Sequence, residues 1–151
     1  MVMESLKAQP WKLCKRVLPQ HTDHGGVMWH GAYVAWLEEA RVEALAQVGL
    51  PYEVISSQGF EMPVVRLEIN YRRALNHGEK VVLESWSLPR QGVRWPWRTI
   101  FLTEEGDRVA EAQVDLVLLS LIGSARRVLR KPPEPLATAL QQLRQGPEPQ
   151  L

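Results

Sequence analysis

The sequence predicts an α+β fold in which an antiparallel five-stranded sheet wraps around one long central helix. One long segment repeats apolar residues at helical spacing, and the other regular segments alternate apolar and polar residues as half-buried strands do. A helix with a single apolar stripe has to bury that stripe, and one sheet can cover it. The length of 151 residues fits a single domain over 1–151, with an ordered core at about 11–130 and a tail after 131.

The long helix is expected from His30 to Val48. Its apolar stripe repeats at intervals of three and four residues and consists of Tyr33, Leu37, Ala40, Ala44 and Val48. Gly49 and Pro51 follow directly, and both residue types are typical of the end of a helix. This segment is therefore the predicted central element of the fold.

Five segments have the character of strands. The first is Lys12–Leu18, which Pro19 ends, and the four others follow the helix at Val64–Arg73, Glu79–Leu88, Arg94–Thr103 and Asp107–Ser120. Short turns that contain glycine separate these four strands, which predicts antiparallel hairpins in a meander. An outer strand of such a sheet leaves an edge that a second subunit can extend, so we expect a dimer. A short helix is expected at 136–143, and the end of the chain from 146 is expected to fray.

Composition bounds the class of protein and its partners. A net charge of +1 gives no field that favours nucleic acid, so no nucleic-acid partner is expected. Cys14 is the only cysteine, which excludes a disulfide framework and favours a reducing cytoplasm. No apolar stretch approaches the roughly 18 residues of a membrane span. We therefore expect a cytoplasmic protein that does not bind a membrane. The six tryptophans are expected chiefly in the core, and secondarily around a flat apolar ligand.

The segment directly before the long helix concentrates the residues that can carry chemistry. It contains Asp23, the pair Gly25-Gly26, and three of the four histidines, namely His21, His24 and His30. Amides in the first turn of a helix lack an intrahelical acceptor and lie at the positive end of the helix dipole, so they can stabilise negative charge on an oxygen. The glycines let the chain bend Asp23 back towards those amides. Histidine and aspartate also suit zinc, but spacing alone shows no convergence, and no metal is expected.

The run HTDHGGVMWHGAYVAWLEEAR, followed by VVRLEINYRRALNHGEKVVLESW, resembles the hotdog-fold acyl-CoA thioesterases of the 4-hydroxybenzoyl-CoA thioesterase group. The resemblance covers roughly residues 11–130 and implies a hotdog fold and hydrolysis of an acyl-CoA. It places the catalytic carboxylate on Asp23, as a nucleophile or as a base on water. It places the donor to the thioester oxygen on the backbone N–H of His30. It implies no cofactor besides the CoA of the substrate.

The same resemblance implies a binding site for CoA along a subunit edge, where basic side chains contact the phosphates. The candidates here are Arg90 and Arg94, with Arg72 and Arg73 behind them. Relatives of this group form assemblies, so a homodimer or homotetramer is implied.

Two departures from the family pattern bear on the substrate. His24 follows the aspartate where many relatives have a small or apolar residue, so its imidazole is a candidate to pair with Asp23 and orient it. Trp29 stands beside the predicted reaction centre and favours a flat aromatic acyl group, with Gly26 and Tyr33 as further substrate-binding candidates. The preferred substrate is 1,4-dihydroxy-2-naphthoyl-CoA, on the route to phylloquinone. Benzoyl, 4-hydroxybenzoyl and phenylacetyl groups remain open.

Several alternatives stay open at this point. Another branch of hotdog thioesterases uses a glutamate on the central helix, which makes Glu38 and Glu39 candidates, although Glu38 and Arg41 also fit a plain pair at i, i+3 spacing. Cys14 and the serines lack an adjacent base in any nucleophile motif. A hotdog dehydratase would use a histidine and a carboxylate from separate elements, whereas His24 and Asp23 are adjacent. A non-catalytic acyl-CoA-binding module would have no need of Asp23.

Overall fold

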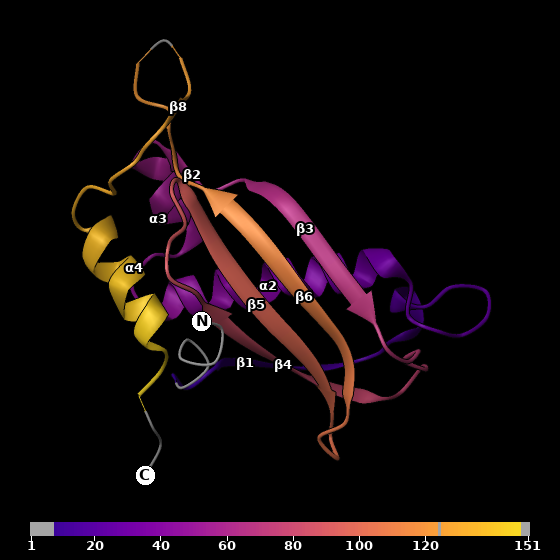
Figure 1. Cartoon of the computed structure of the whole chain (residues 1–151). Coiled ribbons are helices and arrows are strands. Elements are labelled where there is room, and N and C mark those ends of the chain that lie inside the picture. Colours follow the sequence, from indigo (N-terminus) through magenta and orange to yellow (C-terminus); the bar gives the residue numbers. More distant parts are fainter. Residues whose placement is uncertain (1–7, 124, 149–151) are drawn as a thin grey trace.

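The computed structural model describes residues 8–123 and 125–148, and it shows an α+β fold of the hotdog type (Figure 1). An antiparallel five-stranded sheet curves around helix α2 (His30–Gln47). The strands lie in the order β1 (Trp11–Arg16), β4 (Lys80–Ser87), β5 (Arg94–Thr103), β6 (Arg108–Val117) and β3 (Val64–Tyr71). A smaller sheet has the order β2 (Phe60–Glu61), β7 (Leu119–Ser120) and β8 (Arg127–Val128).

The predicted meander is wrong at one connection. β4, β5 and β6 form successive hairpins, but β3 pairs with β6 at the far edge and not with β4. The segment after β3 crosses the end of the sheet instead of folding back. Leu75 in this segment is fully buried, and its carbonyl accepts the N–H of Met28 at 2.8 Å. The glycine-bearing turn at 76–78 therefore belongs to the connection from β3, at one edge of the sheet, to β4, next to the other edge.

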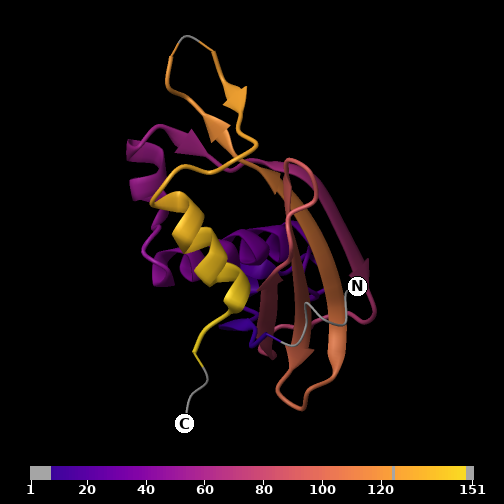
Figure 2. The same cartoon turned by 60° about the vertical axis from the view of Figure 1, so that its left-hand side comes forward.

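The prediction of one long central helix is not confirmed as stated, because the described residues form three α-helices. α2 is the longest, and it is joined by α3 (Tyr52–Ser57) and α4 (Leu136–Gln145); a short 3-10 helix, η1 (Pro19–His21), follows β1. α4 lies on the same side of the sheet as α2 (Figure 2). It buries Leu136, Leu140 and Leu143, and the indole of Trp11 donates a hydrogen bond to the Leu143 carbonyl at 2.9 Å. The C-terminal segment is thus part of the packed structure.

Five of the six tryptophans belong to the packed interior, as the sequence predicts. They are Trp11, Trp36, Trp86, Trp95 and Trp97, each at most 8% exposed. Trp29, by contrast, is 46% exposed at the start of α2. None of the helices in the described part of the chain is long and apolar enough to cross a bilayer. The exception among the tryptophans marks the end of α2 where the candidate site lies.

Candidate active site

Asp23 lies in a tight turn that connects η1 to α2. Its N–H donates to the carbonyl of Val27 at 2.9 Å, and its carbonyl accepts the N–H of Gly26 at 3.1 Å. Gly26 has φ +79°, a left-handed conformation that residues with a Cβ rarely adopt. This accounts for one glycine of the pair, and it confirms that the chain bends at this point.

Backbone amides of the turn orient the carboxylate of Asp23. Its Oδ1 accepts the N–H of Gly25 at 2.8 Å and that of Val27 at 3.3 Å. A Cβ on Gly25 would lie 3.3 Å from the same oxygen, so a side chain there would crowd the carboxylate. Oδ2 has no hydrogen-bond partner among the described residues, and Asp23 is exposed. One carboxylate oxygen is therefore held by the turn while the other is available to a ligand.

His24 does not orient this carboxylate in the structure. The side chain is exposed, and its imidazole makes no hydrogen bond with Asp23 or with any other residue in the described ranges. The amides of Gly25 and Val27 orient the carboxylate, the role for which the sequence made His24 a candidate. A role of His24 towards substrate remains a prediction.

The first turn of α2 leaves backbone donors unpaired. Trp29 is the N-cap residue, with extended φ −86° and ψ 155°, and its side chain makes no capping hydrogen bond. Its carbonyl accepts the N–H of Ala32 at 3.0 Å, whereas the N–H groups of His30 and Gly31 have no acceptor within 8–123 or 125–148. Such donors at the positive end of a helix dipole can bind an oxygen that gains negative charge.

The indole of Trp29 lies across the start of the helix. A Cβ built on Gly31 would come within 2.2–2.5 Å of three atoms of that ring, so only glycine allows the indole to lie there. The ring also meets the imidazole of His30 edge to face, with centroids 5.2 Å apart. Gly31 was missed in the sequence analysis, although a glycine in the first turn of a predicted helix is a signal of close packing.

The turn that carries Asp23 is anchored to the loop between β3 and β4. Met28 is buried, Val27 forms an antiparallel bridge with Asn76, and the N–H of His77 donates to the carbonyl of Gly26 at 3.2 Å. His21 stabilises the other side: its Nδ1 accepts the N–H of Leu18 at 3.0 Å, and its ring packs edge to face on Trp36. Within the described residues, no three metal-ligating side chains of His, Cys, Asp or Glu come together.

Tyr33 lies in the core, one helical turn beyond Trp29. It is 2% exposed and packs edge to face against Tyr71, with ring centroids 5.0 Å apart, and against Phe101. Burial is the main cause that raises the pKa of Tyr33 to about 12, and the nearby Tyr71 adds to it. The phenol is therefore neutral at physiological pH and forms part of the core.

The structure does not bring Arg90 and Arg94 to Asp23 within one chain. Arg94 lies opposite Val117, at the end of the sheet where β3 begins, whereas the Asp23 turn is anchored beyond the other end of β3. Arg94 pairs with the buried Asp115 at 3.1 Å. The guanidinium of Arg90 lies 5.5 Å from the ring centroid of Trp95 and donates to the carbonyl of Arg130.

Arg72 and Arg73 directly follow β3, in the segment that leads to the loop anchoring the Asp23 turn. Both form ion pairs with side chains of the same chain: Arg72 with Glu111 at 3.0 Å, and Arg73 with Glu79 at 3.2 Å. Arg72 shares Glu111 with Arg98 and Arg108, so three guanidinium groups surround one carboxylate on the sheet.

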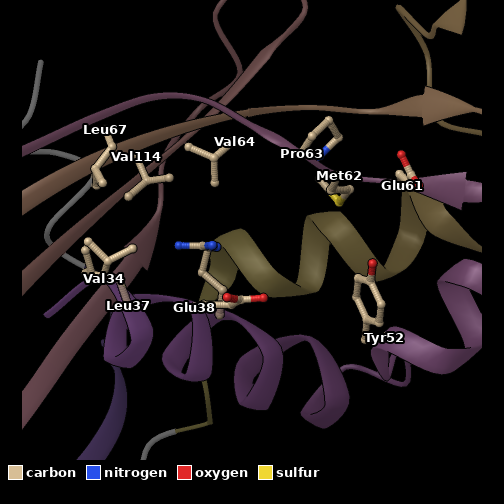
Figure 3. A pocket seen from close by; sticks show the side chains of 11 residues that line it. Val34, Leu37, Glu38, Tyr52, Glu61, Met62, Pro63, Val64, Leu67 and Val114 are labelled. Atoms are coloured by element: carbon tan, nitrogen blue, oxygen red, sulfur yellow. The ribbon is translucent and has the colours of Figure 1, made fainter. Parts of the chain in front are cut away.

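A groove of about 390 Å³ runs between α2 and β3 (Figure 3). Its walls are largely apolar and include Val34, Leu37, Met62 and Leu67. Glu38 and Arg41 from α2 also line it, and burial lowers the pKa of Arg41. Glu39 points elsewhere and accepts hydrogen bonds from Lys15 at 3.1 and 3.2 Å. The groove opens along the edge of the sheet that β3 forms.

Comparison with known proteins identifies the family of this chain. The family model of the thioesterase-like superfamily matches residues 17–141. A Synechocystis protein named as an esterase, sll0410, is 33% identical over 144 residues, which are 95% of this chain and 86% of that protein. The acyl-CoA thioester hydrolase YbgC of Escherichia coli is 23% identical over 116 residues, which are 77% of this chain and 87% of that protein.

A solved structure supports the fold. Slr0204, a 1,4-dihydroxy-2-naphthoyl-CoA thioesterase from Synechocystis, superposes with a TM-score of 0.76 at 21% identity, covering 88% of this chain and 96% of that chain. The chain belongs to the thioesterase-like superfamily. The prediction of a thioester hydrolase is thereby confirmed at the level of enzyme class.

Proposed function

We propose that this protein is an acyl-CoA thioesterase of the 4-hydroxybenzoyl-CoA thioesterase group. It hydrolyses R-CO-S-CoA with water to R-COOH and CoA-SH. One observation carries the proposal: a carboxylate with one free oxygen, on Asp23, precedes by seven residues a helix start whose amides have no acceptor among the described residues. A base or nucleophile on one side and hydrogen-bond donors on the other are what hydrolysis of a thioester needs.

The free oxygen of Asp23 acts on the thioester in one of two ways. It either attacks the carbonyl carbon, which gives a mixed anhydride that water then opens, or it takes a proton from the water that attacks. In both cases the carbonyl oxygen becomes negative, and the N–H of His30 stabilises it. The amides of Gly25 and Val27 hold the other carboxylate oxygen, so the reactive oxygen keeps its direction. His24 borders this centre as a candidate to exchange protons with the leaving thiol.

We propose that the acyl group is aromatic. The exposed indole of Trp29 lies beside the free amides, and a flat ring can stack on it. Gly26 leaves the space in front of the turn open, since no atom would lie within 4 Å of a Cβ there. The preferred substrate is 1,4-dihydroxy-2-naphthoyl-CoA in phylloquinone biosynthesis, which the name of the neighbour Slr0204 supports. 4-Hydroxybenzoyl-CoA is the alternative.

The remaining parts of the proposal concern the carrier and the assembly. Arg90 and Arg94 contact the phosphates of CoA, and the enzyme acts as a homodimer or homotetramer in the cytoplasm. The reaction uses no metal and no organic cofactor, because Asp23 and the helix amides supply both the attacking group and the charge stabilisation. The net charge of +1 supports the absence of a nucleic-acid partner.

The deciding experiment measures thiol release from a panel of aromatic and aliphatic acyl-CoAs, for the wild type and for Asp23→Asn. The wild type is expected to prefer aromatic acyl groups, and Asp23→Asn is expected to lower kcat by about a thousandfold or more with an unchanged melting temperature. Binding of acyl-CoA without thiol release would contradict the proposal. A first turnover in oxygen-18 water tests for the nucleophile: unlabelled acid, with the label in the carboxylate of Asp23, indicates an anhydride that water opened at the Asp23 carbon. Labelled acid results from a base, and also from an anhydride that water opened at the acyl carbon.

A further inference from the structure

We propose that His21 is a positioning residue of the thioesterase: its neutral imidazole holds the Asp23 turn against the start of α2, and a proton taken up by this side chain switches the site off. The inference rests on the proposed function for the roles of Asp23 and the helix amides. It goes beyond that function in assigning a residue that contacts no reacting atom, and in making the activity respond to mildly acidic pH.

His21 connects the two ends of the loop that contains Asp23. Its N–H donates to the carbonyl of Leu18 at 2.9 Å, and its Nδ1 accepts the N–H of the same residue at 3.0 Å. Its carbonyl accepts the N–H of Trp29 at 3.0 Å. Leu18 directly precedes η1, and Trp29 directly precedes α2. The hydrogen bonds of one residue therefore fix both the entry and the exit of this loop.

The contact made by the imidazole depends on its protonation state. A neutral imidazole has one N–H and one acceptor nitrogen, whereas an imidazolium has an N–H on both nitrogens. Because Nδ1 accepts from Leu18, the neutral side chain carries its proton on Nε2. A proton on Nδ1 sets two donors against each other, so the hydrogen bond is lost and the N–H of Leu18 loses its acceptor.

The other side of the imidazole packs against α2. The ring meets Trp36 edge to face, with centroids 5.2 Å apart and an angle of 76° between the planes. Trp36 is 2% exposed, two turns into the helix whose first amides are the proposed donors. A rotation of the imidazole away from Leu18 would also change this packing. His21 thus couples η1 to α2 through its side chain as well as its backbone.

The segment that His21 holds leads directly into Asp23. Thr22 lies between the two residues, and both its N–H (3.1 Å) and its Oγ1 (2.7 Å) donate to the carbonyl of Pro19. The start of the turn therefore depends on the conformation of η1, which the contact with Leu18 closes. When that contact is lost, the free oxygen of Asp23 has no fixed position relative to the helix amides, and small displacements of a reacting group are costly. We expect a lower kcat at little changed KM.

The other three histidines lack this kind of contact. His24, His30 and His77 are all exposed, whereas His21 is half-buried. Their imidazoles make no hydrogen bond within residues 8–123 and 125–148, and that of His30 only meets the indole of Trp29 edge to face. An effect of imidazole protonation on the shape of the turn is therefore specific to His21.

The charged groups on the elements around His21 form no ion pair with its imidazole in the described chain. They are Lys15 and Arg16 of β1, Glu39 of α2, Asp23 and His24 of the turn, and Glu79 of the loop before β4. Lys15 pairs with Glu39 at 3.1 Å, and Glu79 pairs with Arg73 at 3.2 Å. A proton on His21 therefore acts through the lost contact with Leu18 and through no rearranged ion pair.

The pH profile of His21→Asn tests this role. The Oδ1 of asparagine lies as many bonds from the backbone as Nδ1 of histidine, and it accepts a hydrogen bond without titrating. We expect kcat of the wild type, measured as thiol release from an aromatic acyl-CoA, to fall by about tenfold between pH 8 and pH 5.5, as for one proton on an imidazole. His21→Asn is expected to stay within a few-fold of its own value at pH 8, and His21→Ala to have a low kcat at both pH values.

His77→Asn is the matched control. This imidazole is exposed in the loop that anchors the Asp23 turn, and the residue contributes its backbone N–H, which asparagine keeps. We expect the control to show the same acid fall as the wild type, and all variants to remain folded at pH 5.5 by circular dichroism. An acid fall in His21→Asn equal to that of the wild type, its loss in His77→Asn, or global unfolding of the wild type at pH 5.5 would each overturn the inference.

Nuclear magnetic resonance tests the contact without substrate. At pH 8, the nitrogen-15 shifts of the His21 ring should show the proton on Nε2. On acidification, the amide proton of Leu18 should shift with the same midpoint as the His21 ring, and it should not shift in His21→Asn. A proton on Nδ1 at pH 8, or a Leu18 amide that ignores the titration of the ring, would overturn the inference.

The two proposals fail in different ways. A wild type that releases no thiol at any pH contradicts the proposed function and, with it, a role of His21 in that reaction. Thiol release that depends on Asp23 but falls equally in the wild type and in His21→Asn contradicts only the role of His21.

Discussion

The two ends of α2 differ in whether their last backbone groups are hydrogen-bonded. At the C-terminal end, Gly49 has φ +84°, its N–H donates to the carbonyl of Ala46 at 3.1 Å, and the N–H of Leu50 donates to the carbonyl of Leu45 at 2.9 Å. Leu50 is 2% exposed and covers this end with an apolar contact. The closing carbonyls are thus satisfied in the manner of a glycine-terminated helix.

The N-terminal end forgoes this kind of stabilisation. The N-cap residue is Trp29, whose side chain cannot accept a hydrogen bond from the helix amides, where serine or aspartate would stabilise a helix by about 1 kcal/mol. A capping side chain would accept the N–H of Gly31 or Ala32 and place an oxygen beside the N–H of His30 that the proposed reaction needs. The C-terminal end of α2, the closed end, has its last backbone groups hydrogen-bonded and covered. The N-terminal end, the open end, keeps its amides free for a ligand at a cost in helix stability.

Among changes at the two ends of α2, the largest effect should come from removing one donor at the open end. His30→Pro deletes the N–H of the first helical residue, where proline is well tolerated, and Trp29 already has the extended backbone that precedes a proline. We expect kcat to fall by about 10²–10³-fold, the usual cost of one such donor, with little change in stability. Thiol release and thermal unfolding measure the two quantities.

His30→Ala is the control for this variant, because it keeps the N–H and removes the imidazole. We expect its kcat to stay within a few-fold of the wild type. If both variants lost activity equally, the side chain of His30 and not its amide would be the reacting group.

Capping the open end is expected to have a smaller effect, which raises stability and lowers activity. Trp29→Asp places a carboxylate where it can accept the free N–H of Gly31, so it should raise the free energy of unfolding by about 1 kcal/mol. The same carboxylate competes with the thioester oxygen, and kcat should fall by about tenfold or more. Trp29→Ala removes the indole without adding an acceptor. A more active and more stable Trp29→Asp would show that the open amides have no catalytic role.

The sequence predicted the elements of this site because they depend on local chemistry. The helix from His30 was predicted within one residue at its end, since periodicity and Gly49 are local signals. The bend at Gly26 is likewise set by one backbone conformation. The hydrogen bonds that orient Asp23 were not predicted, because a histidine side chain and a backbone amide compete for the same carboxylate and only the folded turn decides between them.

Local sequence patterns could not predict how distant segments of the chain are arranged. A glycine-bearing turn at 76–78 shows that the chain turns, but not that β3 pairs with β6 at the far edge of the sheet. α3 and the two-residue strands β7 and β8 are too short for periodicity to reveal. The separation of Arg90 from Asp23 depends on strand order in the same way, so the sequence placed them in one site without showing that they lie at opposite ends of β3.

At the closed end, a change should alter stability and leave catalysis alone. Gly49→Ala forces a residue with a Cβ into φ +84°, although no neighbouring atom would obstruct that Cβ. We expect a loss of about 1 kcal/mol in the free energy of unfolding, or roughly 2–4 °C in Tm, at unchanged kcat and KM. Denaturant unfolding and thiol release check this together. A drop in kcat would mean that the two ends of α2 are coupled and the comparison fails.

The smallest effect concerns the buried phenol between the two ends and appears only at alkaline pH. Tyr33 has a pKa of about 12 in the folded chain against 10.0 for an ordinary tyrosine, because burial disfavours the phenolate. The folded state therefore holds its proton more tightly than the unfolded state, so this stabilising contribution is full below pH 10 and is lost as the pH rises towards 12. In that window, the free energy of unfolding should fall less steeply with pH for Tyr33→Phe than for the wild type. At pH 7–9, the two free energies should differ by a constant amount. Tyr71→Phe should flatten it less, since the pKa of Tyr71 is also raised but that side chain is half exposed. An identical alkaline slope in Tyr33→Phe and wild type would show that the phenol titrates as freely in the folded chain as in the unfolded one.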